Sequence, residues 1–84
     1  MKIKLLYFGR PRENLRLSQE NAELPLNTAT VADLLGWLRR RGPDWAAEMT
    51  ENRVRCAINQ ELGTPASPLR DGDEVAIFSP ISGG

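Results

Sequence analysis

The sequence ends in Gly83 and Gly84, which follow Pro80, Ile81 and Ser82. Because glycine lacks a Cβ atom, this dipeptide can adopt nearly any backbone conformation and pass through a channel too narrow for side chains. The carboxylate of Gly84 could then be delivered as a reactive group into the active site of another protein. The alternative is a terminus without a function, since chain ends are usually poorly ordered unless other contacts hold them.

The five residues from Pro80 to Gly84 span at most about 17 Å when extended, a length that suits insertion into a partner's pocket. Pro80 fixes its own φ and biases Ser79 toward extended geometry, so it restrains the direction in which the tail leaves the domain. Ile81 and Ser82 would line the mouth of such a channel. We therefore expect a directed tail.

Cys56 is the one cysteine, and the sequence holds no histidine. Val54, Cys56 and Ile58 alternate along a predicted strand and share one face of it. This pattern predicts a buried, unreactive thiol, because a sulfur nucleophile needs an exposed site that depresses the thiol pKa. An intramolecular disulfide and most metal or histidine-based catalytic sites are also excluded.

The acidic run Asp71-Gly72-Asp73-Glu74 has two interpretations. Oxygen ligands suit calcium, but the further spaced ligands of a calcium loop are missing from this run. Asp-Gly before an alternating apolar segment is a strong turn signal. We therefore predict a turn here and no metal bound by the chain.

The composition indicates one small globular domain over residues 1–84, with 40% hydrophobic and 26% charged residues. Eleven basic residues balance eleven acidic ones, so no overall positive field favours nucleic acid as a partner. No apolar stretch approaches the length of a signal sequence or a membrane span. We expect a cytoplasmic protein.

Apolar periodicity predicts the elements that must position the tail. Thr30 and Asp33 form a capping-box pattern before a helical stripe of apolar residues, and Gly42-Pro43 stops that helix. Arg39 to Arg41 would then complement the carbonyl end of the helix or contact a partner. The expected elements are a strand over 2–8, a turn or short helix over 9–14, a polar strand within 15–26, the helix over 31–41, a helical turn over 44–50, a strand over 53–58, a loop over 59–68 and a strand over 74–79.

This order suits an α+β fold with a mixed sheet of four to five strands and one main helix packed on one face. Leu6 and Phe8 in the first strand, like Ala76 and Phe78 in the last, have the parity of the opposite face. If these strands are parallel neighbours, both phenylalanines lie beside the start of the tail and form an apolar docking patch. Alternatively, they pack under the loop over 59–69, which contains Leu62.

Four short motifs precede the terminal glycines. They are Phe-small-x-x-Arg-Glu at 8–13, Thr-Val-x-x-Leu at 30–34, Ala-x-Asn-Gln at 57–60 and Pro-Leu-x-Asp-Gly-Asp-Glu-Val-Ala at 68–76. In this order the chain resembles the ubiquitin-like β-grasp sulfur carriers, and among them the small sulfur-carrier subunits of molybdopterin synthases. Ser79 departs from the pattern, since the family often has a first proline of a Pro-Pro pair there.

The resemblance implies a β-grasp domain whose residues 79–84 form an extended Gly-Gly tail. It implies that an activating enzyme uses ATP to adenylate Gly84 and that a sulfur donor then converts it to a thiocarboxylate. The thiocarboxylate would donate sulfur to a cyclic pyranopterin precursor, giving the molybdopterin dithiolene. The chain would be non-catalytic alone and bind no cofactor itself.

The implied partners are the large synthase subunit, in a heterotetramer of two small and two large subunits, a ubiquitin-activating-like adenylyltransferase, and a sulfur donor such as a cysteine desulfurase or rhodanese. Phe8, Leu62 and Phe78 match family positions at the interface with the large subunit. Arg12 and Glu13 match the family motif, and either contact the partner or hold the first turn through an ion pair. Carriers for thiamine synthesis or tRNA thiolation, and ubiquitin-like protein modifiers, remain as alternatives.

Overall fold

The protein folds around one mixed sheet. The structure is a computed structural model that describes residues 1–80. The strands are β1 (Lys2–Tyr7), β2 (Gln19–Glu23), β3 (Arg55–Ile58), β4 (Glu61–Leu62) and β5 (Glu74–Phe78), in the spatial order β2-β1-β5-β3-β4. β1 and β5 run parallel, and the other neighbouring pairs are antiparallel. The predicted mixed sheet and its ubiquitin-like β-grasp class are thereby confirmed.

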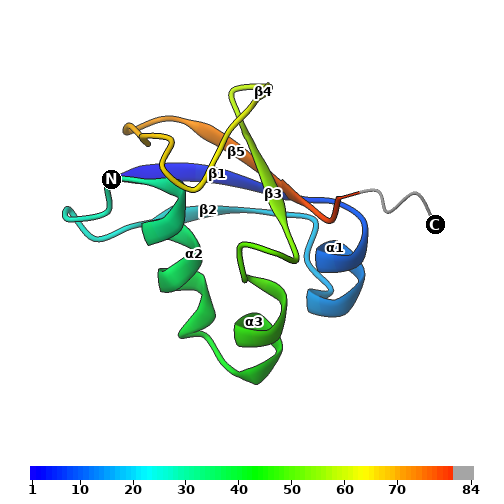
Figure 1. Ribbon diagram of the computed structural model, residues 1–84. Helices are drawn as coiled ribbons and strands as arrows, with labels where there is room; N and C mark the ends of the chain where they lie inside the picture. Colours follow the sequence, from blue (N-terminus) through cyan, green and yellow to red (C-terminus); the bar gives the residue numbers. More distant parts are fainter. Residues whose placement is uncertain (81–84) are drawn as a thin grey trace.

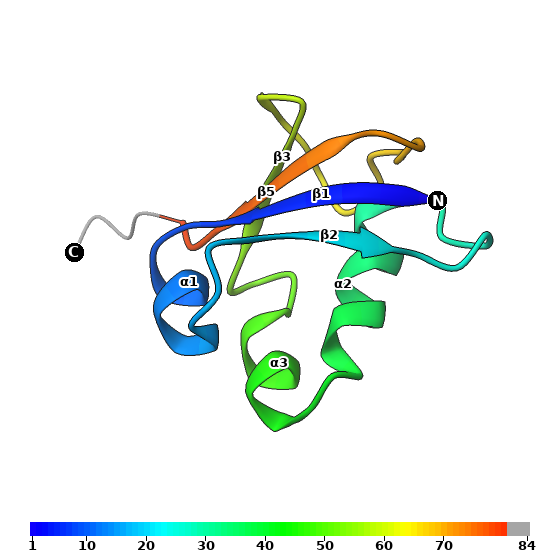
Figure 2. The ribbon, with the colours of Figure 1, turned by 180° about the vertical axis from the view of Figure 1, so that it is seen from behind.

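Three helices lie on one side of this sheet (Figures 1 and 2). They are α1 (Arg10–Leu15), α2 (Val31–Arg39) and α3 (Pro43–Glu48). The capping box predicted for α2 is present: the hydroxyl of Thr30 accepts from the Asp33 amide, and the carboxylate of Asp33 accepts from the Thr30 amide, each at 3.2 Å. The hydrogen bonds from the backbone of Ala29 and Thr30 lower the pKa of Asp33.

α2 ends at Arg39, two residues earlier than the sequence pattern predicts. The amides of Arg40 and Arg41 donate to the carbonyls of Trp37 and Leu38, three residues back, so the chain tightens out of α-helical geometry before it reaches Gly42. Gly42 has φ 144° and leads into α3, whose first residue is Pro43. Gly42-Pro43 therefore starts a second helix and does not itself end the first.

The core lies between the inner face of the sheet and α2. Apolar residues on alternate positions of β1 and β5 meet the leucines of α2, and all of them are shielded from solvent. The largest fully buried side chains in this layer are Ile3, Leu5, Tyr7, Leu34, Leu35, Leu38, Met49, Val75 and Ile77. Burial raises the pKa of Tyr7, whose hydroxyl donates to Glu20 at 2.6 Å.

The side chain of Arg41 contacts β2 and both of the helices α2 and α3. Its guanidinium donates to both carboxylate oxygens of Glu20, at 2.6 and 3.0 Å, and lies over the rings of Trp37 and Trp45, with its Cζ at 4.8 and 4.6 Å from their centroids. Arg39 instead donates to the carbonyl of Met49 at 2.6 Å. Arg41 is therefore engaged in a long-range internal contact that the sequence pattern did not indicate, in addition to its place just after the end of α2.

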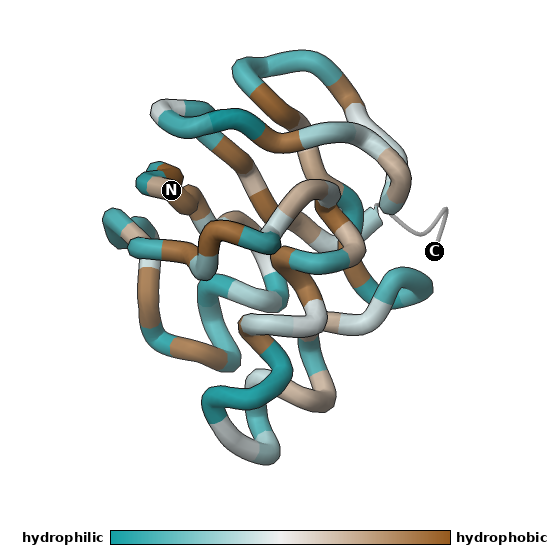
Figure 3. The backbone as a smooth tube through the Cα atoms, turned by 90° about the vertical axis from the view of Figure 1, so that its left-hand side faces the viewer, coloured by the Kyte–Doolittle hydropathy of each residue, from teal (hydrophilic) through white to brown (hydrophobic). Residues whose placement is uncertain are grey.

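Hydrophobic and hydrophilic positions alternate over short stretches of the chain (Figure 3). Within residues 1–80, no helix has both the length and the apolar character needed to cross a bilayer.

Candidate functional site

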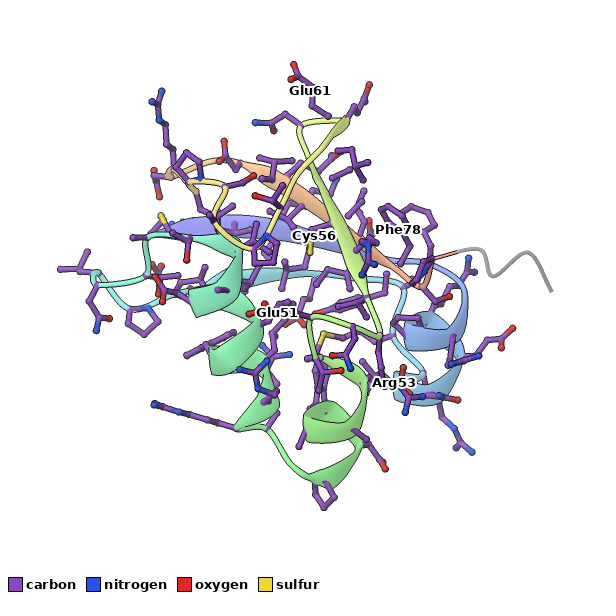
Figure 4. All side chains as sticks on the ribbon, in the orientation of Figure 1. Glu51, Arg53, Cys56, Glu61 and Phe78 are labelled. Atoms are coloured by element: carbon purple, nitrogen blue, oxygen red, sulfur yellow. The ribbon has the colours of Figure 1, made fainter. Side chains whose placement is uncertain are left out.

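The outer face of the sheet, turned away from the helices, carries the apolar residues singled out in the sequence. The parallel register pairs Leu6 with Ala76 and Tyr7 with Ile77, and the Phe8 amide extends this pairing by donating to the Ile77 carbonyl at 2.9 Å. Phe8 and Phe78 therefore lie on neighbouring strands at the same end of the sheet. Figure 4 shows Phe78 close to the point where the described chain ends.

The loop after β4 does not cover these phenylalanines. Its carbonyls at Pro65 and Ser67 accept from the amides of Ala32 and Val31, at 2.9 and 3.0 Å, so the loop lies against the start of α2. Phe8 remains 46% exposed, and Phe78 is partly buried. The alternative, in which both phenylalanine rings pack under this loop, is therefore wrong.

Leu62 shares the outer face from the other edge of the sheet. It pairs with Ala57 of β3, which in turn pairs with Ala76 of β5, and it is 74% exposed. Residues directly opposite one another on paired strands point to the same face. We call the resulting outer surface the docking face; its residues are Leu6, Phe8, Ala57, Leu62, Ala76 and Phe78.

The hairpin that places Leu62 depends on Asn59, whose role the motif at 57–60 alone does not indicate. Asn59 and Gln60 have φ 50° and 73°, as a two-residue hairpin turn with positive φ requires. The Asn59 side chain donates to Asp73 at 2.9 Å and accepts from the Glu74 amide at 3.0 Å. The turn is thereby fastened to the start of β5. An asparagine between two apolar runs was the signal that could have identified it.

The tail leaves the sheet beside Gly9. This glycine has φ 64° and ψ −135°, like the first central residue of a type II′ turn, a conformation that side chains disfavour. A Cβ placed on it would lie 3.2 Å from the Ser79 hydroxyl. Gly9 thus lets β1 turn sharply into α1 while Ser79 packs against its backbone. Pro80 is exposed, and the predicted site residues Ile81, Ser82, Gly83 and Gly84 lie outside the described residues.

Arg12 and Glu13 lie on α1, which begins directly after Gly9, and both are exposed. The ion pairs within residues 1–80 join Met1 to Glu23, Arg41 to Glu20 and Arg53 to Glu48, so the expected Arg12–Glu13 pair is absent from this part of the chain. The short helix is instead held by the Glu13 amide, which donates to the Gly9 carbonyl at 3.0 Å. The prediction that Arg12 and Glu13 hold the first turn through an ion pair is therefore wrong.

Cys56 lies inside the fold, between β3 and the helices (Figure 4), and is 4% exposed. Burial raises the pKa of its thiol to about 12. At neutral pH the sulfur is therefore protonated and shielded from partners, as the strand pattern predicts.

The acidic run forms the predicted turn. Asp71 accepts from the Lys2 amide at 2.7 Å, Asp73 accepts from the Arg70 amide at 2.8 Å, and Gly72 has φ 88°. These carboxylates thus cap backbone amides. Within residues 1–80, no group of three or more histidine, cysteine or acidic side chains is arranged to hold a metal ion.

Residues 5–84 match the model of the ThiS family. The molybdopterin synthase sulfur carrier subunit of Chlamydomonas reinhardtii is 38% identical over the whole of both chains. The protein of the same name from Escherichia coli is 34% identical over 98% of this chain and 99% of its own length.

Solved structures agree with this similarity. A Pyrococcus furiosus protein assigned as subunit 1 of a molybdopterin converting factor superposes with a TM-score of 0.79 at 31% identity, over 96% of this chain and 99% of its own. A chain from the complex of subunits 1 and 2 of the Helicobacter pylori molybdopterin-converting factor superposes with a TM-score of 0.64 over the whole of both chains. At 19% identity, this second likeness concerns the fold alone.

Proposed function

Because the chain belongs to the ThiS family, we propose that it is the sulfur carrier subunit of a molybdopterin synthase. The relatives of that name match it over nearly their full lengths. The observation that carries the proposal is the position of Phe8 and Phe78, which flank the start of the segment leading to Gly84 on a face that residues 1–80 leave uncovered. The domain would dock through this face and present the tail.

The reactive group in this proposal is the carboxyl group of Gly84. An activating enzyme adenylates it with ATP and releases pyrophosphate, which gives an unreactive acid a good leaving group. The terminal sulfur of a persulfide on a donor such as a cysteine desulfurase or rhodanese then displaces AMP and forms an acyl disulfide. A thiol reduces this acyl disulfide, which leaves the thiocarboxylate on Gly84 and joins the donor cysteine to that thiol in a disulfide. The sulfur of this thiocarboxylate attacks a cyclic pyranopterin precursor on the large subunit, and water then cleaves the resulting thioester, so that the sulfur stays on the pterin and the Gly84 carboxylate is regenerated. Two carriers provide the two sulfurs of the dithiolene.

In this proposal the chain positions the reacting group at Gly84, and its partners provide the catalytic groups. Its only thiol is buried, and its sequence has no histidine to act as a general base. It also lacks a glycine-rich phosphate loop with its lysine. Docking converts the sulfur transfer into a step within one complex, which lowers the entropic part of the barrier.

The proposed partner is the large synthase subunit, in a heterotetramer of two small and two large subunits. A structure similar in fold, from Helicobacter pylori, is a complex of subunits 1 and 2 of molybdopterin-converting factor. Exposed apolar side chains such as Phe8 and Leu62 are the kind that protein interfaces bury. Leu62 would contact the partner farther from the tail than the two phenylalanines.

The test is the intact mass of the chain after incubation with the activating enzyme, ATP and a sulfur donor. We expect a product heavier by the difference between a sulfur and an oxygen atom, and no such product from a variant that lacks Gly84. A ladder of conjugates to protein lysines without the mass gain would contradict the proposal and identify a ubiquitin-like modifier. Preferential binding to a thiazole synthase or a tRNA-thiolating enzyme would keep the carrier role but change the pathway.

A further inference from the structure

We propose that the docking face contains a socket that takes one bulky apolar side chain of the large subunit. Ala57 and Ala76 form its floor, and Leu6, Leu62 and Phe78 form its walls. This inference rests on the proposed function and deepens it, because it names the chemistry that the partner must present opposite the sheet.

The floor consists of two small residues side by side. Ala57 of β3 and Ala76 of β5 are direct partners in the antiparallel register, and both are partly buried. Side chains in such a pair have Cβ atoms about 5 Å apart. Since alanine ends at Cβ, the surface is lower here than over any leucine or phenylalanine beside it.

The same strand register determines which side chains form the walls. Leu6 lies opposite Ala76 on β1, and Leu62 lies opposite Ala57 on β4. A row across four strands therefore reads large, small, small, large. With strands about 4.8 Å apart, the two leucines are rooted roughly 14 Å from each other, which leaves a gap between them about one side chain wide.

Phe78 closes the end of the socket nearest the tail. It follows Ala76 by two residues on β5 and so lies on the same face, about 7 Å farther along the strand. At the opposite end, Glu74 shares this face and pairs through its backbone with Asn59. Arg55 of β3 lies opposite Phe78 on this face, and its guanidinium donates to the backbone carbonyls of Glu51 and Val54. The socket therefore has apolar walls at Leu6, Leu62 and Phe78, borders Arg55 beside Phe78, and is polar at the end away from the tail.

This environment selects an apolar occupant. The side chains of the floor offer no donor or acceptor, so a buried polar group would lose its hydration without compensation. Interface energy is typically concentrated in a few anchors that fill such hollows while neighbouring contacts exclude water. Leu62 and Phe8, the most exposed of these neighbours, are placed to exclude it.

The experiment fills the socket from the carrier's side. Ala57→Leu and Ala76→Leu add apolar area to the docking face but occupy the volume reserved for the partner's anchor. We expect each variant to bind the large subunit about 30-fold or more weakly, measured by titration calorimetry against the wild-type chain. If the face were only a flat apolar surface, the added leucine would leave the affinity unchanged or increase it. Either of those results overturns the socket.

The matched control is Ala46→Leu, an alanine-to-leucine change at an exposed position of α3 on the other side of the sheet. It should bind like the wild type, and all three variants should unfold within a few degrees of it. A floor variant that fails to fold is replaced by Ala57→Val or Ala76→Val, read by the same criterion. Failure of the wild-type chain itself to bind would contradict the proposed function, whereas tight binding by both wild type and floor variants would contradict only the socket.

Discussion

The two faces of the sheet use the same strands for different purposes. On the inner face Val75 and Ile77 of β5 are completely buried, while on the outer face Ala76 and Phe78 of the same strand keep part of their surface exposed. The inner face therefore stabilises the fold. The outer face is left for a partner, so a substitution there should affect binding and a substitution on the inner face should affect stability.

The largest expected difference is between two neighbours in β5. Ile77→Ala removes a fully buried side chain and should lower the free energy of unfolding by about 2–5 kcal/mol, a large part of the stability of a small domain. Phe78→Ala should cost less than about 1.5 kcal/mol, yet weaken binding to the large subunit by roughly 10- to 100-fold. Urea unfolding and calorimetric titration measure the two quantities. An equal loss of stability in both variants would mean that Phe78 belongs to the core.

The inner side also carries a charged contact, which should make stability depend on pH. Burial alone would raise the pKa of Glu20, but hydrogen bonds from Arg41 and Tyr7 outweigh it, so the pKa in the folded protein lies below its usual value of 4.5. The carboxylate therefore contributes stability above the pKa of the unfolded chain, and this contribution is lost as the pH falls through the folded pKa.

Glu20→Gln should lower the free energy of unfolding by about 1–2 kcal/mol at pH 7. The difference from wild type should shrink as the pH falls from about 5 to 3, because protonation removes the same charge from the wild-type chain. Affinity for the large subunit at pH 7 should be unchanged, since Glu20 points to the helix side. A constant difference in stability across this pH range would contradict the ionic role of Glu20.

The smallest expected effect concerns Gly9, which lies against Ser79 at the start of the tail. Gly9→Ala and Gly72→Ala both place a side chain at positive φ and should each cost about 1 kcal/mol of stability. Only the Cβ at position 9 meets Ser79, at 3.2 Å, whereas nothing lies within 4 Å of a Cβ at position 72. We therefore expect a several-fold slower sulfur transfer at saturating large subunit for Gly9→Ala alone.

A second substitution distinguishes the contact with Ser79 from backbone strain at position 9. Ser79→Ala removes the hydroxyl that the new Cβ would meet, so the double variant Gly9→Ala/Ser79→Ala should regain the wild-type transfer rate while keeping the lower stability. If Ser79→Ala rescues nothing, the effect of Gly9→Ala comes from the turn itself, and the contact with Ser79 has no part in directing the tail.

Local patterns in the sequence predicted local structure well. The capping box at Thr30 and the turn at Gly72 are both present, because each depends on residues within a few positions of one another. The alternation around Cys56 likewise predicted its burial. Parity assigned Phe8 and Phe78 to the outer face, but only the parallel register of β1 and β5 brings them together.

Features that depend on distant residues were missed, and two local expectations were wrong. The contact of Arg41 with Glu20 joins positions 21 residues apart, and no local pattern indicates it. The early end of α2 arises from the tightened turns at Arg40 and Arg41. The expected ion pair of Arg12 with Glu13 is wrong, because neighbouring residues on a helix do not face each other. The alanine floor of the socket and its two leucine walls required the register of four strands.

The most direct test of the account is a single-turnover reaction of the thiocarboxylated chain with the large subunit and the cyclic pyranopterin precursor. We predict that sulfur leaves Gly84 and appears in the dithiolene product, that Phe78→Ala slows this transfer at limiting large subunit but not at saturation, and that Ala46→Leu changes neither. Persistence of the thiocarboxylate, with no sulfur in the pterin after binding is complete, would contradict the account.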